Sequence, residues 1–516
     1  MLKLPNILRF SRYARGIFCR QQSTTSPNQK VKESQFSAEN FQDFTTRRQA
    51  EALRSVMLEV NTTDICGQVY HHCKQFGEIK NAFVYTLKNE RNLMLIEYDN
   101  VDAVSETFKF SGFQPNTVKW PNRVLTVRNS KLNSSLPKEA PLRIDSAVEP
   151  PIADILRNAA NFDEQVNLLY EHTRLTDLSI RLKFISALQA QVIINEYLDE
   201  IFPNAKVYPF GSTVNGFGKM GCDLDMALRF DRQTDNSEDN NHMPLAFQGK
   251  DYANAEDVKK LEGRQVKCIA SLIDYFLPGT DAVSAFHGAR VPIVRYFDTN
   301  IHSSVDLSVN NLDGFHISEL MYAMGLLDAR IRPFIFMVRR WAKEFEITRY
   351  NARDNFTNFQ LSYMCLSFLQ QLKEPLVPTF DDMMHQIGNS EAKSAGSIVK
   401  NSFIFNFERF QFKTKNTSTV LELFAQFLEY YQSFDFEKYL ITVRSTEKIQ
   451  KPEPSPLYLE NVFDTTSFWG GNVSDAECST LKIMIRETLM ELEQCSSKPT
   501  DKDKDWGLLE IISKLK

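Results

Sequence analysis

Two stretches of the 516-residue chain alternate acidic or small residues with large apolar ones, and they constrain the fold more than any other feature. In the first, 223–230, Asp223 and Asp225 alternate with leucine and methionine; in the second, 303–310, Asp306 lies between valine and leucine. This period of two predicts strands with one buried face, so Asp223 and Asp225 face the same way, about 7 Å apart. If the two strands are adjacent, three carboxylates converge. Carboxylates this close repel one another unless a cation is bound, so the pattern predicts a site for two divalent ions, Mg²⁺ or Mn²⁺.

A glycine-rich turn lies just upstream. Gly211 and Ser212 follow a short apolar strand pattern, and three more glycines follow before Asp223. Bare backbone amides in such a turn can approach a polyphosphate closely. Two metal ions beside a bound triphosphate form an arrangement that catalyses in-line nucleotidyl transfer. The alternative for Asp223 and Asp225 alone is a surface turn, but three acids on apolar strands cost free energy unless a cation is bound.

The N-terminal segment has the composition of a targeting sequence. Seven lysines and arginines precede the first acidic residue, Glu33, and a polar run rich in serine and threonine spans 21–29. This predicts a mitochondrial transit peptide over 1–35 and a location in the mitochondrial matrix. The alternative is a disordered basic tail. A secretory signal is disfavoured because no unbroken apolar segment is present.

Length and charge limit the remaining possibilities. A chain of 516 residues is longer than a single hydrophobic core normally accommodates, so we expect two to four domains. RNA binding normally depends on lysines and arginines that neutralise the phosphates. Because the formal charge of the chain is −5, we expect any RNA contact to be confined to a local basic groove. No apolar run reaches membrane length, so we expect no membrane span.

Residues 50–130 show the order strand, helix, strand, strand, helix, strand. This order, the phrase Phe-Gly-Glu-Ile at 76–79 and the strand 92–98 resemble the RNA-recognition-motif family. In that strand, however, leucine, methionine and isoleucine replace the expected aromatic residues, and only Tyr98 remains. Base stacking is therefore disfavoured, although RNA binding stays an alternative. We expect an assembly module that forms a homodimer.

Composition changes divide the rest of the chain. The predicted segments are a linker at 131–150, a palm at 176–320 with a polar insertion at 231–257, a helical domain at 152–175 and 321–480, and a charged tail at 496–516. Within the palm, 289–296 is expected to be the strand between the two aspartate strands.

Several motifs together resemble the DNA-polymerase-beta-like nucleotidyltransferases, in the branch of template-independent poly(A) and poly(U) polymerases. The motifs that match the palm are Gly211-Ser212, Asp223-Leu224-Asp225, 289–293, Asp306 and Asn310-Asn311. The motifs that match the helical domain are 327–333, 341–343 and 361–363. The nucleotide-recognition loop is matched by 456–473. The resemblance implies an α+β fold: a nucleotidyltransferase palm of mixed sheet and helices and a helical poly(A)-polymerase-associated domain, preceded by the α/β sandwich.

The resemblance also implies residue roles. Asp223, Asp225 and Asp306 would hold both metal ions. The nucleotide-binding residues would be Gly211, Ser212, Asn311, Arg339, Lys343, Ser362, Tyr363 and Asn472, with Tyr363 stacking on the base. Many members have lysine where this chain has Arg339, and the asparagine and threonine expected after Asp306 are Ile317 and Ser318.

The implied function is addition of AMP from ATP to RNA 3′ ends without a template, with RNA and ATP as partners. Relatives that prefer UTP use a histidine in the recognition loop, and this chain has none after His385, which favours adenine. The alternatives are a uridylyl or oligonucleotide nucleotidyltransferase of the same fold and a catalytically silent RNA-binding scaffold.

Overall fold

The structure is a computed structural model of the chain. It describes residues 39–112, 123–145, 159, 161–198, 205–230, 255–288, 291–309, 311, 313–349, 355–386, 412–464 and 467–497. The predicted transit peptide, most of the insertion at 231–257 and nearly all of the charged tail lie outside these residues. The chain divides into two compact units. We call the unit of 41–149 and 173–322 the sheet unit, and the unit that contains 150–172 and 323–516 the helical unit.

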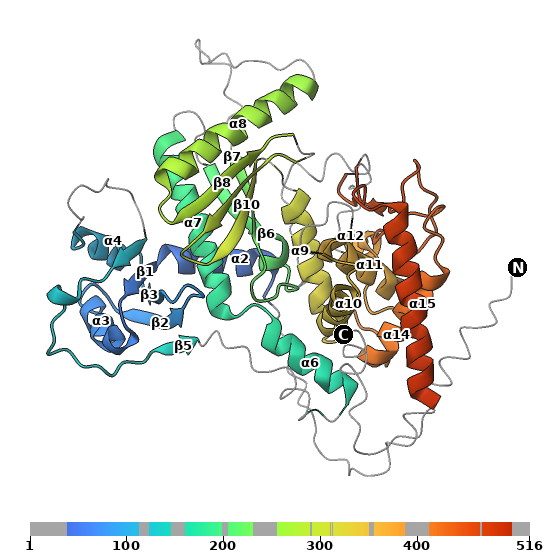
Figure 1. Ribbon diagram of the computed structural model, residues 1–516, viewed down its shortest axis with the longest axis horizontal. Helices are drawn as coiled ribbons and strands as arrows, with labels where there is room; N and C mark the ends of the chain where they lie inside the picture. Colours follow the sequence, from blue (N-terminus) through green and yellow to red (C-terminus); the bar gives the residue numbers. More distant parts are fainter. Residues whose placement is uncertain are drawn as a thin grey trace, which may run out of the picture. The chain divides into compact units, whose positions relative to one another are not determined.

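The sheet unit begins with the predicted α/β module (Figure 1). Its elements are α2 (Phe41–Leu53), β1 (Ser55–Val60), α3 (Cys66–Cys73), β2 (Ile79–Thr86), β3 (Asn92–Tyr98), α4 (Asp102–Lys109), β4 (Val124–Thr126) and β5 (Arg143–Asp145). The strands form one sheet in the order β4-β1-β3-β2-β5. The expected order of strands and helices is therefore confirmed, with α2 and β5 as additions.

Both faces of this sheet are buried. Alternate side chains of β1, β2 and β3, among them Ile96 and Tyr98, form a core with α3 and α4. On the opposite face, Leu95 and Glu97 of β3 are fully buried as well. This is the face on which an RNA-recognition motif stacks bases, and here the rest of the sheet unit covers it.

Ion pairs join that second face to the palm. Glu97 accepts hydrogen bonds from Arg54 and from Arg181 of α7 (Asp177–Leu198) at 2.9 and 2.7 Å. Arg91 donates to the carbonyl of Thr299 at 3.2 Å, in the turn between the palm strands β9 (Ile293–Asp298) and β10 (Ser303–Val309). The module and the palm are thus one compact unit, whereas the sequence predicted two domains joined by a linker.

The palm is a second five-stranded sheet, in the order β6-β7-β10-β9-β8. The new elements are β6 (Ala205–Phe210), β7 (Leu224–Phe230), α8 (Ala255–Phe276), β8 (Thr280–Phe286) and α9 (Asp313–Leu326). β7 and β10 are parallel, and the other neighbours are antiparallel. The strand expected at 289–296 is β9, which starts at Ile293. Along the chain it lies between the two aspartate strands, as expected; in the sheet it pairs with the far side of β10, because β7 and β10 pair directly.

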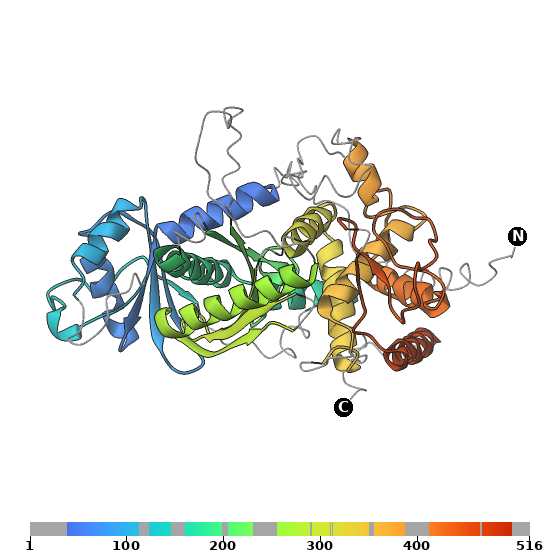
Figure 2. The same cartoon turned by 90° about the horizontal axis from the view of Figure 1, so that it is seen from above.

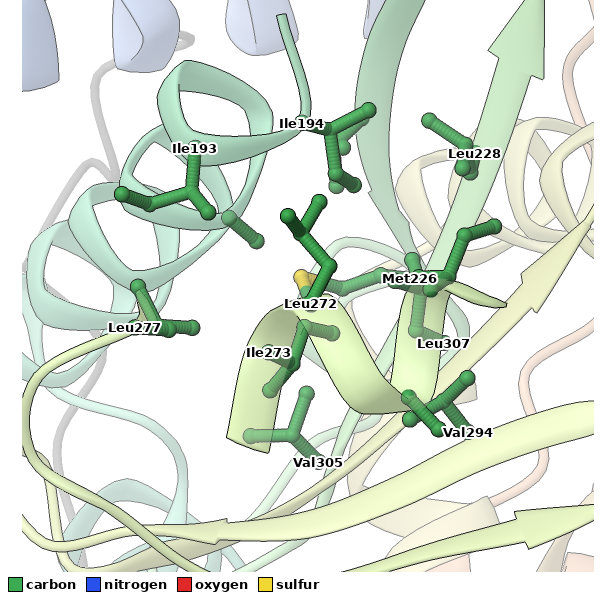
Figure 3. Close-up of a cluster of buried hydrophobic side chains, with 14 of the residues drawn as sticks. Ile193, Ile194, Met226, Leu228, Leu272, Ile273, Leu277, Val294, Val305 and Leu307 are labelled. Carbon is green, nitrogen blue, oxygen red and sulfur yellow. The ribbon is translucent and has the colours of Figure 1, made fainter. Parts of the chain in front are cut away.

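Helices α7 and α8 lie side by side on one face of the palm sheet (Figure 2). Their apolar side chains pack with those of the strands in one buried cluster, which includes Ile194, Met226, Ile273, Val305 and Leu307 (Figure 3). Alternation along β7 and β10 then directs the intervening residues, including the aspartates, to the opposite face.

The helical unit accounts for most of the rest. It contains α6 (Phe162–Thr173) up to its last residue, α10 (Ile331–Glu344), α11 (Asn358–Gln371), α12 (Phe380–Gln386), α14 (Val420–Ser433), α15 (Asp475–Ser497) and the short strands β11 (Leu459–Glu460) and β12 (Phe468–Trp469). Asp163 of α6 accepts hydrogen bonds from the first backbone amides of α14, at Val420 and Leu421. This contact joins α6 to α14 within the helical unit. Among the described residues, no helix is long and apolar enough to cross a membrane.

Candidate active site

The structure brings the predicted acids together. Asp225 on β7 and Asp306 on β10 are direct cross-strand partners in parallel register. Asp225 also lies opposite Phe210 on β6, and Asp306 opposite Arg295 on β9, so these residues form one row across four strands. Asp223 stands exposed just before β7 begins. The prediction that the two aspartate strands are adjacent is confirmed.

The three carboxylates perturb one another. Burial raises the pKa of Asp225 to about 7, and the negative charges of Asp306 and Asp223 add to the effect. The pKa of Asp223 is also raised, first by burial and then by Asp306. Such mutual repulsion is relieved when a cation is bound, and carboxylate oxygens are the ligands that Mg²⁺ and Mn²⁺ prefer. The donor set of this site therefore fits divalent ions.

Arg295 already binds the third acid. Its Nε donates to Oδ1 of Asp306 at 2.7 Å, and its Nη2 donates to Oδ2 at 2.6 Å. Among the described residues, no three histidine, cysteine or acidic side chains stand ready to hold a metal ion together. At this site both oxygens of Asp306 are directed to the guanidinium. The strand at 289–296 was predicted, but the role of Arg295 was not.

Lys183 fixes the backbone at the start of β7 by hydrogen bonds. This buried residue of α7 donates to the carbonyl oxygens of Cys222 and Asp223 at 2.7 and 3.1 Å. Its positive charge opposes the rise in the pKa of Asp223 and Asp225. Sequence reasoning missed Lys183, although a lysine inside the apolar stretch 180–188 was a usable signal.

The glycine turn lies directly against the acids. Gly211 has a φ of +65°, and a Cβ atom placed on it would lie 2.6 Å from Oδ2 of Asp225. Its amide donates to Oγ of Ser318 at 2.7 Å. Only glycine satisfies both the backbone conformation and this approach. Ser318, expected in sequence as a departure from the family pattern, instead holds the turn.

The other palm residues lie close in sequence to these elements. Ser212 is half-buried in the short 3₁₀ turn 211–213 that follows β6. Asn311 is half-buried and follows β10 by two residues. Their assignment to triphosphate and ribose stays a prediction.

In the helical unit, Arg339 and Lys343 lie four residues apart on α10 and thus on one helical face. Lys343 is exposed. Arg339 donates from Nε to Oδ1 of Asn358, the first residue of α11, at 3.2 Å. Arg339 therefore lies at the start of α11, and Lys343 lies one turn further along α10 on the same face.

Ser362 and Tyr363 do not match their expected roles. Ser362 is 2% exposed and donates to the carbonyl of Asn358, one turn earlier. The ring of Tyr363 is fully buried; its hydroxyl donates to the carbonyl of Glu460 and accepts from the amide of Val443. A side chain enclosed in this way cannot stack on an incoming base. Tyr363 instead fixes the segment that carries β11.

Phe359 is the aromatic residue that sequence reasoning missed. It lies in the first turn of α11 with a half-buried ring, 5.1 Å from the ring of Trp469 in an edge-on arrangement. The helix starts here because Thr357 and Gln360 form a capping box. That Thr-x-x-Gln signature was visible in the sequence and would have placed Phe359, not Tyr363, at the accessible end of the helix.

Asn472 completes this group. It is exposed, accepts a hydrogen bond from Gln360 at 2.6 Å and donates to the carbonyl of Asn355 at 2.8 Å. Residues on both sides of the start of α11 therefore orient its amide. The predicted recognition loop and the first turn of α11 meet in one cluster, which comprises Arg339, Asn358, Phe359, Trp469 and Asn472.

Comparison with known proteins identifies the family. The model of the central palm domain of "Poly(A) RNA polymerase, mitochondrial-like" matches residues 162–325. The mitochondrial poly(A) RNA polymerase of Drosophila melanogaster is 33% identical, over 88% of this chain and 76% of that protein. The Homo sapiens enzyme of the same name is 27% identical, over 93% of this chain and 82% of that protein.

Solved structures agree with this relationship. A crystal structure of mtPAP in complex with ATPγS is 26% identical and superimposes with a TM-score of 0.78, covering 92% of this chain and 99% of that one. A complex of mtPAP with UTP is 27% identical, with a TM-score of 0.79 and the same coverage. The chain belongs to the family of mitochondrial poly(A) RNA polymerases and is a polynucleotide adenylyltransferase.

Proposed function

We propose that this polymerase adds AMP from ATP to RNA 3′ ends through a site built on Asp223, Asp225 and Asp306. The single observation that carries the proposal is the parallel register that places Asp225 beside Asp306. Polymerases of this fold use divalent metal ions, and we assign these three carboxylates as the ligands of two ions, Mg²⁺ or Mn²⁺.

Each residue near the acids has a separate task. When bound, the two ions would activate the RNA 3′-hydroxyl and neutralise the leaving pyrophosphate. Asp306 takes the proton of the RNA 3′-hydroxyl while the hydroxyl oxygen attacks the α-phosphorus of ATP. Gly211 and Ser212 bind the triphosphate: the missing side chain of Gly211, whose amide is bonded to Ser318, allows close approach, and the Ser212 amide donates to a phosphate oxygen. Asn311 binds the ribose. Lys183 keeps the start of β7 in position through two carbonyl oxygens.

The helical unit supplies further nucleotide-binding groups. We assign Arg339 and Lys343 to phosphates, Phe359 to stacking on the base, and the Asn472 amide to base recognition. The support is their clustering at the start of α11 and the half-buried ring of Phe359. Stacking of a base on an aromatic ring contributes about 1–3 kcal/mol.

Primer extension tests the function directly. The purified chain is incubated with labelled RNA and Mg²⁺ or Mn²⁺, with ATP, UTP, GTP and CTP supplied separately. We expect ladders of extended RNA with ATP and none from Asp225→Asn. Preferential incorporation of UMP would identify a uridylyltransferase, and no metal-dependent incorporation would identify a scaffold.

We also propose a homodimer that uses the α/β module. Its second sheet face is covered by the palm, so the module retains its edges and outer surface for partners. Strand β5 lies at the edge of the sheet, where another chain can pair with it, and it carries Ile144, which is 79% exposed. Light scattering should show a dimer that Ile144→Asp converts to a monomer, while Val101→Asp, at another exposed apolar position, leaves it intact. A monomeric unmodified chain overturns this proposal.

Residues 1–35 are proposed to direct the chain to the mitochondrial matrix, on the basis of their composition. Their fusion to a fluorescent reporter should place the reporter in the matrix. The same fusion with its seven lysines and arginines changed to glutamine should stay outside mitochondria. A matrix signal from that control would overturn the assignment.

A further inference from the structure

The guanidinium of Arg295 and the carboxylate of Asp306 form a two-pronged ion pair across neighbouring strands. The residues are direct partners in the antiparallel pair of β9 and β10, and both donor–acceptor distances are below 2.8 Å. Arg295 also lies over the ring of Phe286 on β8, with 5.5 Å between its Cζ and the ring centroid. The register of three strands thus directs this guanidinium toward the acids.

The pair uses both carboxylate oxygens of Asp306. A divalent ion that binds Asp306 needs at least one of these oxygens. The guanidinium and the ion cannot both hold the same lone pairs, and their positive charges repel at this distance. The side chain of Arg295 is 52% exposed, whereas that of Asp306 is 20% exposed. Arg295 can therefore move toward solvent at a smaller desolvation cost than a buried partner could.

We infer that Arg295 is a positioning residue that holds Asp306 in the metal-free enzyme and competes with the divalent ion for it. The inference rests on the proposed function, because it takes Asp306 as a metal ligand. Asp225 and Asp223 offer a first ion their oxygens, and occupancy at Asp306 requires the guanidinium to withdraw from at least one oxygen. Arg295 thereby sets how much Mg²⁺ or Mn²⁺ the site needs, and in the metal-free enzyme it offsets the repulsion among the acids.

Direct metal binding tests this inference without reference to catalysis. Binding of Mn²⁺ to the full chain is titrated by the electron paramagnetic resonance signal of free Mn²⁺, without RNA or nucleotide. Arg295→Gln should bind Mn²⁺ about threefold more tightly and at most about fivefold, since a partly exposed ion pair is worth up to about 1 kcal/mol. Arg295→Lys keeps the positive charge but loses the two-pronged hydrogen bonding of the guanidinium, so its Mn²⁺ affinity should lie between those of the unmodified chain and Arg295→Gln.

Arg264→Gln is the matched control. Arg264 is exposed on α8, the helix that covers the opposite face of the palm sheet, so its loss removes one charge without touching Asp306. Its Mn²⁺ affinity should equal that of the unmodified chain. If Arg264→Gln gains as much affinity as Arg295→Gln, the effect is general charge and the inference fails. Unchanged affinity in both Arg295 variants also overturns it.

A double-mutant cycle separates this inference from the proposed function. In the Asp306→Asn background, removal of Arg295 should give no further gain in Mn²⁺ affinity, because the carboxylate through which it acts is absent. A full additive gain contradicts competition for Asp306 while leaving the metal site intact. Absence of Mn²⁺ binding in every variant, including the unmodified chain, overturns the metal assignment itself and the inference with it.

Discussion

A Cβ atom on Gly211 would lie 2.6 Å from Oδ2 of Asp225, so the glycine turn and this acid occupy adjoining space. Such a contact is shorter than van der Waals separation and must displace either the turn or the carboxylate. Because Asp225 is held by its strand, the turn is the part expected to move. The position of this turn, to which we assign the triphosphate, thus depends on the position of Asp225 because Gly211 lacks a side chain.

Gly211→Ala should therefore reduce primer extension strongly and destabilise the sheet unit. The φ of +65° alone costs about 1 kcal/mol for alanine, and the contact with Asp225 adds to it. Gly221→Ala is the matched control, since Gly221 has a φ of +73° with nothing within 4 Å of the added Cβ. Urea unfolding and initial rates of both variants separate strain from contact. Equal losses in the two variants would show that the contact is unimportant.

Asp225→Asn should abolish AMP addition and stabilise the metal-free protein. The loss of rate should reach about a thousandfold, since a catalytic metal site supplies several kcal/mol to the transition state. In EDTA at pH 8, the variant should unfold at higher urea because the repulsion with Asp306 and Asp223 is gone. Addition of Mn²⁺ should stabilise the unmodified chain more than the variant. A less stable variant in EDTA would contradict the repulsion.

The acid site was predictable because its information is local. Alternation along 223–230 and 303–310 predicted both strands and the shared face of the acids, and the apolar positions left adjacency as the natural packing. The ion pair of Arg295 with Asp306 depends instead on which strand lies beyond β10 and in which register. The sequence predicted a strand at 289–296 but neither its place in the sheet nor its register, so Arg295 could not be identified as the partner of Asp306.

The other differences between the sequence-based predictions and the structure arise from packing between residues far apart in the chain. The second face of the α/β module is covered through contacts between residues far apart in the chain, such as Glu97 with Arg181, which no local pattern reports. In α11, the prediction followed a short Ser-Tyr motif and missed where the helix begins. The capping box at Thr357 puts Phe359 in the first turn of the helix, whereas Tyr363, one turn further along the same face, is fully buried.

Phe359→Ala and Tyr363→Phe should have opposite consequences. Loss of the Phe359 ring should raise the KM for ATP about tenfold with little loss of stability, because base stacking contributes about 1–3 kcal/mol. Tyr363→Phe removes a hydroxyl bonded to Glu460 and Val443, so stability should fall by about 1–3 kcal/mol while the KM stays near that of the unmodified chain. Steady-state kinetics and urea unfolding check both. An unchanged KM in the Phe359 variant would contradict the stacking role of that ring.

Glu97→Gln should destabilise the sheet unit by about 3 kcal/mol, because it leaves buried cationic partners without their counter-charge. Glu97 is fully buried and pairs with Arg54 and Arg181. The control is Glu106→Gln, which breaks an exposed pair with Lys109 and should leave the stability almost unchanged. Equal, small losses in urea unfolding would mean that the ion pairs do not hold the module against the palm.

Glu429 makes the stability of the helical unit depend on pH. Burial raises the pKa of this α14 residue from 4.5 to about 7, and the charge of Glu493 on α15 adds to the rise. The folded state then binds the proton more tightly than the unfolded state, so stability is lost as the pH rises from about 4.5 to 7 and stays reduced above it.

Glu429→Gln should therefore be more stable than the unmodified chain at pH 8, by roughly 1–2 kcal/mol after allowance for partial exposure. The gain should shrink toward zero near pH 5. Glu493→Gln removes only the smaller cause and should give a smaller gain. Urea unfolding between pH 5 and 8 checks the three proteins, and a gain for Glu429→Gln that is constant with pH would contradict the raised pKa.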